Sequence, residues 1–130
     1  SYYPVIANIT LKRAAGTNTE GGSSAAEYDA IQFKKQGNGD FTNIVISGYT
    51  TSGATAVRIQ DAATNTDQVN GSKIKLTTVK INDGTSEYAA AGTTFSVAFP
   101  SGQYTTSSVA TGATITNGAW STVGGVTLLQ

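Results

Sequence analysis

The stretch that decides the fold class is residues 3–12, YPVIANITLK, near the start of the 130-residue chain. Apolar and other side chains alternate along it, and the apolar residues of one face are Val5, Ala7, Ile9 and Leu11. A period of two is typical of a β-strand that buries one face. The stretch therefore predicts an amphipathic first strand whose apolar face packs on a core.

Shorter alternating runs follow, separated by clusters of Gly, Asn, Asp and Ser, and none is longer than a strand. This pattern predicts strands over residues 27–36, 41–47, 54–61, 73–81 and 95–99. A capping-box pattern at 24–27 also permits a helix, but the apolar residues that follow it form no helical stripe.

The turns complete the fold prediction. The segment Gly37-Asn38-Gly39-Asp40 predicts a tight reversal into the next strand. The dipeptide Asn117-Gly118 predicts a two-residue hairpin that places Ile115 opposite Trp120. We therefore expect an all-β fold, a single antiparallel β-sandwich or jelly-roll-like barrel with about eight strands and little or no helix.

Three details refine the expected strands. The consecutive residues Ile44, Val45 and Ile46 predict a central strand with two apolar faces. Within 54–61, the alternation places Val57 and Ile59 inward and Arg58 outward. Within 73–81 the apolar residues change phase, and one extra residue at Thr77-Thr78 predicts a β-bulge that bends the strand.

The chain is short enough to form a single β domain over residues 1–130. Residues 14–26 have no period and are rich in Gly, Ser and Thr, which predicts a flexible loop or arm. Residues 1–13 either pair within their own chain, the simpler interpretation, or are exchanged with a neighbouring copy by strand addition. The segments 47–52 and 101–107 resemble each other, which chance explains better than two related half-sheets.

Composition excludes most chemical functions. The chain has no Cys and no His, which removes disulfides, thiolate metal sites and the usual general base. Eight Lys and Arg balance eight Asp and Glu, so a basic surface for nucleic acid is not expected. No apolar run is long enough to enter a membrane as a helix, and no catalytic motif is present. We expect no enzyme activity, no cofactor and no metal.

A calcium site is the one metal hypothesis that the sequence raises. Asp61, Asn65, Asp67 and Asn70 supply hard oxygen ligands within one short segment. The spacing lacks the closing bidentate Glu of an EF-hand, and Asn and Asp are common in turns for conformational reasons alone. Turn chemistry is therefore the favoured interpretation.

Charge is distributed unevenly along the chain. No residue after Glu87 is charged, whereas protein interfaces are depleted in charge and enriched in aromatic residues. This segment either supplies central strands or faces a neighbouring subunit, and its polar residues 101–114 favour the second interpretation. The residues predicted to form an assembly interface are Val5, Ile9, Leu11, Tyr104, Trp120 and Leu128.

These observations predict a non-enzymatic structural subunit of a multi-copy assembly. Its expected partners are copies of itself and a capsid or tail scaffold protein, in a bacteriophage virion as a capsid decoration or tail protein. The N-terminus lacks a signal-peptide pattern, which fits either a trimmed initiator Met or a leader already removed. An extracellular filament or pilus subunit is the first alternative. A carbohydrate-binding module that uses Tyr49, Tyr104 or Trp120 is the second.

Overall fold

The computed structural model describes residues 3–13, 29–50, 52–90 and 95–114, together with two short strands near the C-terminus. The long strands are β1 (Val5–Lys12), β3 (Gly39–Ser47) and β5 (Ile74–Ile81). The short strands are β2 (Ile31–Phe33), β4 (Val57–Ile59), β6 (Tyr88–Ala90), β7 (Tyr104–Thr106), β8 (Thr122–Val123) and β9 (Val126–Thr127). One helical segment consists of α1 (Ala62–Thr64) and the π-helical turn η2 (Asn65–Val69).

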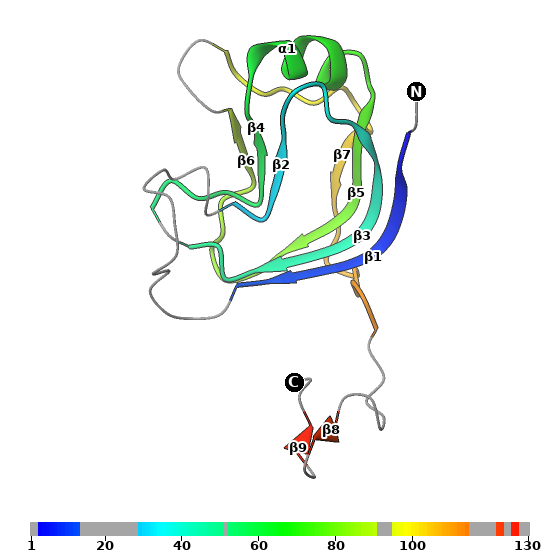
Figure 1. Ribbon diagram of the computed structural model, residues 1–130, viewed down its shortest axis with the longest axis vertical. Helices are drawn as coiled ribbons and strands as arrows, with labels where there is room; N and C mark the ends of the chain where they lie inside the picture. The colour runs from blue at the N-terminus through cyan, green and yellow to red at the C-terminus, as the bar shows by residue number, and fades with distance from the viewer. Residues whose placement is uncertain are drawn as a thin grey trace.

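The strands form two sheets that are parallel throughout. One sheet has the order β1-β3-β5-β7 and the other β2-β4-β6, while β8 and β9 form a separate antiparallel pair. The chain therefore alternates between the sheets and climbs by one strand in each at every coil, which is the architecture of a β-solenoid. Figure 1 shows the long strands curving around two sides of the molecule and the short strands β2, β4 and β6 closing a third.

The expectation of an antiparallel sandwich or jelly-roll-like barrel is therefore wrong, although the chain is dominated by strands as predicted. A period of two reports which face of a strand is buried and carries no information on the direction of its neighbours. The predicted reversal at 37–40 illustrates the error, because β2 and β3 do not pair. This segment instead carries the chain from one sheet to the other.

Each long strand bends at one residue with left-handed backbone geometry. These residues are Asn8, Asn43 and Thr78, with φ of 61°, 55° and 56°. They occupy equivalent positions in successive coils, and Asn43 donates a 2.8 Å side-chain hydrogen bond to Asn8, 35 residues earlier. Asparagine adopts this conformation more readily than most residues. The predicted irregularity at Thr77-Thr78 is confirmed, because the register between β5 and β7 shifts there.

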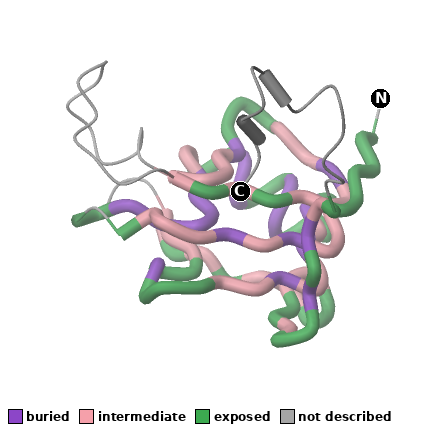
Figure 2. The backbone as a smooth tube through the Cα atoms, turned by 90° about the horizontal axis from the view of Figure 1, so that it is seen from below, coloured by how far each residue is buried: buried purple, intermediate pink, exposed green. Residues whose placement is uncertain are grey.

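Apolar residues stack in rows between coils to form the core. One row contains Ile9, Ile44 and Val79, and a second contains Leu11, Ile46 and Ile81. Ile44 and Ile46 have no exposed surface, and β3 lies between β1 and β5 as expected of a central strand. Figure 2 shows buried positions recurring along the stacked segments of the chain.

The bend at Asn8 changes which residues of the first strand face inward. Its row partners show that Ile6 faces the interior, because it stacks on Phe41 and the buried Leu76. Val5 stacks on Asp40 and is 72% exposed, on the outer face. The predicted face is therefore right for Ile9 and Leu11 and wrong for Val5, because a left-handed residue shifts the alternation by one.

Two other predicted segments differ from the structure. Residues 62–69, whose Asn and Asp residues were attributed to turns, are helical, and the Asp61 side chain caps the segment by accepting from the Thr64 backbone N–H at 2.8 Å. Phe95, Val97 and Phe99 pack against the core with Ser96 and Ala98 exposed, as an alternating strand would, yet they pair with no described strand. The hairpin predicted at 117–118 and the loop predicted at 14–26 lie outside the described residues.

After β7 the chain crosses the outer face of the larger sheet as a strap, residues 107–114. Ser107 donates a backbone hydrogen bond to Val79 of β5, and the backbone N–H groups of Thr111 and Gly112 donate to the Asn43 side chain of β3. The Ala113 N–H then reaches the Thr10 hydroxyl of β1 at 2.9 Å. The strap thus connects the last coil to the first.

Candidate functional site

The outer edge of β1 combines unpaired backbone groups with exposed apolar side chains. β1 is the end strand of its sheet, and no described strand pairs with its free side. Its first four residues are all exposed, including Ile6 at 46%. Beside them, Tyr3 is 44% exposed. Solenoids usually cover such an end with a polar capping element, and long uncovered edges are sites of association.

The backbone groups on this edge follow from the hydrogen bonds on the other side of β1. Asp40 donates to the Pro4 carbonyl, and Arg13 donates to the Ser47 carbonyl. In a parallel ladder, residues alternate in the side to which their N–H and C=O point. Those of Val5, Ala7, Thr10 and Lys12 therefore point to the free side.

The structure brings together only some of the residues predicted to form an assembly interface. Val5, Ile9 and Leu11 lie on β1, with Val5 exposed and the other two partly buried against the core. Tyr104 lies on β7, at the opposite edge of the same sheet. Trp120 and Leu128 lie outside the described residues.

Tyr104 belongs to an aromatic cluster rather than to an exposed platform. Its ring lies 4.9 Å from that of Tyr88 and 5.4 Å from that of Phe99, measured between centroids. Its hydroxyl is buried and has no hydrogen-bond partner among the described residues. Burial, together with the nearby Glu87 carboxylate, raises the pKa of Tyr104 well above its ordinary value. The neutral phenol is therefore the form that this cluster accommodates.

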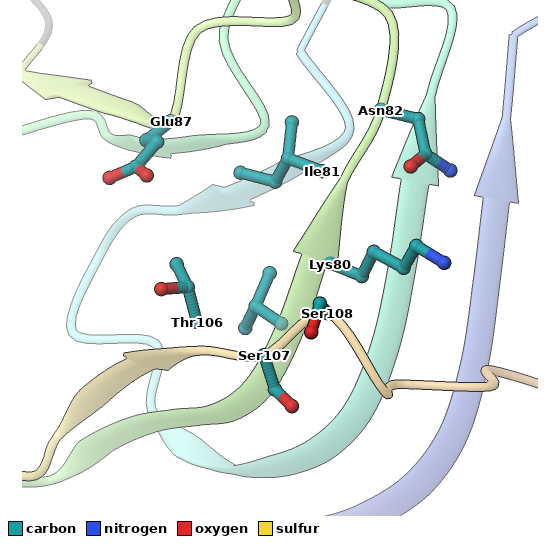
Figure 3. Close-up of a pocket in the computed structure, with 8 residues that line it drawn as sticks. Lys80, Ile81, Asn82, Glu87, Thr106, Ser107 and Ser108 are labelled. Carbon is teal, nitrogen blue, oxygen red and sulfur yellow. The ribbon is translucent and has the colours of Figure 1, made fainter.

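A cleft of about 340 Å³ lies beside the C-terminal end of β5, at the point where β7 ends. Figure 3 shows Ile81 pointing toward Glu87 across the cleft, with Thr106 between them and below, while Lys80 and Asn82 point away. Glu87 is the one charged side chain that points into this space in the view. A single carboxylate with neighbouring hydroxyls does not form an acid–base pair for catalysis.

A buried ion pair joins Arg58 of β4 to Asp29, which precedes β2, and the alternation pattern did not predict it. Arg58 was expected to face outward, but its side chain is only 9% exposed and forms a bidentate ion pair with the Asp29 side chain, which has no exposed surface. Asp29 also accepts a 2.7 Å hydrogen bond from the Thr55 backbone, and Arg58 donates to the Gly53 and Ala90 carbonyls. Nothing local in the sequence indicates this pairing, because its members are 29 residues apart.

The segment proposed for calcium has other partners for its carboxylates. Hydrogen bonds from the backbone N–H groups of Thr64 and Lys35 lower the pKa of Asp61 below its ordinary value. Asp67 accepts a 2.6 Å hydrogen bond from the Gln36 side chain. Among the described residues, no three acidic side chains gather closely enough to hold a metal ion. Across all the residues that the structure describes, no helix is long and apolar enough to span a bilayer.

Comparisons with known proteins add no family. No protein-family model, no curated protein and no solved structure matches the chain.

Proposed function

We propose that the chain is a non-enzymatic structural module of a multi-copy assembly and that copies associate through the open edge of β1. One observation carries the proposal. A long sheet edge is left unpaired among the described residues, with exposed apolar side chains next to free backbone donors and acceptors. Isolated edges of this kind favour pairing with another strand.

A bacteriophage virion, in which the chain would be a capsid decoration or tail component, is the proposed setting. A cell-surface filament is the alternative. A solenoid without Cys or His has no thiol for disulfide exchange and no side chain whose ordinary pKa lies near neutral pH, which suits a durable structural part in either setting. The presence of the chain in purified particles, compared with its presence in sheared surface filaments, distinguishes the settings.

The association itself is tested by light scattering of the purified chain over a range of concentrations. We expect a mass above that of the 13.3 kDa monomer, rising with concentration. Val5→Lys places a charge on the apolar edge, and we expect it to weaken association by about tenfold or more, which corresponds to about 1.4 kcal/mol.

The matched control is Val109→Lys. Val109 is 79% exposed and lies on the strap, away from the β1 edge, so the same substitution there should leave association unchanged. A wild-type chain that stays monomeric at high concentration would contradict the proposed function.

A further inference from the structure

We propose that the β1 edge pairs with the same edge of a second copy, in antiparallel orientation about a two-fold axis that passes between Asn8 and Ile9, at the bend of the strand. This inference rests on the proposed assembly function and specifies its first contact. It follows from three properties of the edge: its backbone pattern, the match of its faces, and its charge.

The free backbone groups on β1 form a self-complementary set. They belong to Val5 and Ala7 on one arm and to Thr10 and Lys12 on the other, with the left-handed Asn8 between the arms. A two-fold axis through the bend exchanges the arms, and it sets Val5 opposite Lys12 and Ala7 opposite Thr10 of the second copy. In an antiparallel ladder, opposed residues that both face the partner exchange two hydrogen bonds. Every free group along the edge then finds a partner.

The same register matches the faces of the two sheets. It places Ile6 opposite Leu11 of the second copy, and both residues belong to rows that face the solenoid interior. On the outer face it places Ala7 beside Thr10, whose hydroxyl already contacts the strap. A small side chain suits the position next to this covered residue. The pairing thus covers Ile6, which is 46% exposed in the single chain.

Charge supports a second copy as the occupant. In this register, Lys12 of one copy lies opposite Val5 of the other. Asp40 is the next residue in the same row, because it is the register partner of Val5. Two strand spacings of about 4.8 Å separate the Lys12 and Asp40 backbones, which the two side chains together can span. Asp40 lies 3.9 Å from Lys75 and is partly exposed, so it is accessible to a second cation. The net charge of the chain is zero, so two copies meet without overall repulsion.

A head-to-tail arrangement uses the available edges less well. It would set β1 against β7, which is three residues long whereas β1 has eight. The chain leaves the sheet directly after β7 to form the strap, so most of β1 would remain unpaired. A closed two-fold contact satisfies both edges at once.

Disulfide crosslinking tests the register, because the natural chain has no Cys. Opposed residues in a hydrogen-bonded antiparallel pair have Cα atoms about 5.5 Å apart, within the range of roughly 4.4–6.8 Å that a disulfide spans. We expect an equal mixture of the single variants Val5→Cys and Lys12→Cys to form a crosslinked heterodimer under mild oxidation. Each variant alone should stay reduced, because the two-fold register keeps copies of one position far apart.

The outcomes separate the two proposals. A wild-type chain that associates, combined with a mixture that forms no heterodimer, would overturn the two-fold register and leave the assembly function standing. Efficient disulfide formation by Val5→Cys alone would also overturn it, because it indicates a parallel or shifted pairing. Should either variant fail to fold, the pair Ala7→Cys and Thr10→Cys tests the same register with the same two outcomes.

Discussion

The two parallel sheets are held in place by different means. The larger sheet contains the long strands β1, β3 and β5, whose apolar rows and left-handed bends recur at equivalent positions in successive coils. The smaller sheet has strands of only three residues, and its central strand is fixed by the buried pair of Arg58 and Asp29. The smaller sheet also packs the fully buried Val57 and Ile59 into the core, so the two sheets differ in that the smaller one adds a buried ion pair to its apolar contacts.

The largest expected effect is at this ion pair. Asp29→Asn leaves the Arg58 charge buried without its counter-ion, and we expect a loss of about 3–5 kcal/mol in the free energy of unfolding, measured with urea. The double variant Asp29→Asn with Arg58→Met should recover much of this loss, because it removes the stranded charge. If the single variant costs less than about 1 kcal/mol, the ion pair does not hold the central strand of the smaller sheet in place.

The corner residue Asn43 should have the next largest effect. Its side chain bonds to Asn8 and to the strap, and its backbone is left-handed. Asn43→Ala loses these bonds and strains the backbone, with an expected cost of about 2–3 kcal/mol. Asn43→Gly keeps the left-handed geometry without strain, so it should cost less, about 1–2 kcal/mol in the same urea assay. Equal costs for the two variants would show that the left-handed geometry contributes nothing.

A single core position in the larger sheet should have a smaller effect. Ile46 has no exposed surface and lies in a row with Leu11 and Ile81. Ile46→Val removes one methylene group and should cost about 0.5–1.5 kcal/mol. A cost as large as that of Asp29→Asn would remove the contrast between the sheets.

The smallest effect at neutral pH is expected for Tyr104→Phe, which removes a buried hydroxyl without a described partner. We expect a change within about 1 kcal/mol at pH 7. The folded-state pKa of Tyr104 is raised, so its contribution to stability is present below the unfolded pKa of about 10 and is lost as the pH rises above it. Urea unfolding between pH 9 and 11 should therefore show a steeper loss of stability for wild type than for Tyr104→Phe. Parallel curves would contradict the raised pKa.

Sequence patterns predicted which side chains of a strand are buried better than they predicted which strands pair and in which direction. The inward positions of Val57 and Ile59 follow from alternation alone, and both residues are fully buried. Strand direction could not be obtained in this way. A stronger clue was available in the triplets Ala7-Asn8-Ile9, Thr42-Asn43-Ile44 and Thr77-Thr78-Val79, which recur at the spacing of one coil.

The candidate site was predicted only in part, for physical reasons. Val5 was correctly placed on the first strand, but its outward direction depends on the left-handed geometry of Asn8, which the alternation pattern does not contain. The buried environment of Arg58 depends on Asp29 in another coil. The free side of β1 is a property of the sheet order, which no local pattern encodes.

The strap has a consequence for how the molecule unfolds. An open stack of coils loses its terminal units first, since each end unit has one neighbour fewer than the others. Here the strap that follows β7 is bonded to side chains of β3 and β1, so both ends of the stack are tied to each other. Fraying at either end must first release this tie. The coils should therefore melt as one cooperative unit, with similar hydrogen-exchange protection at both ends.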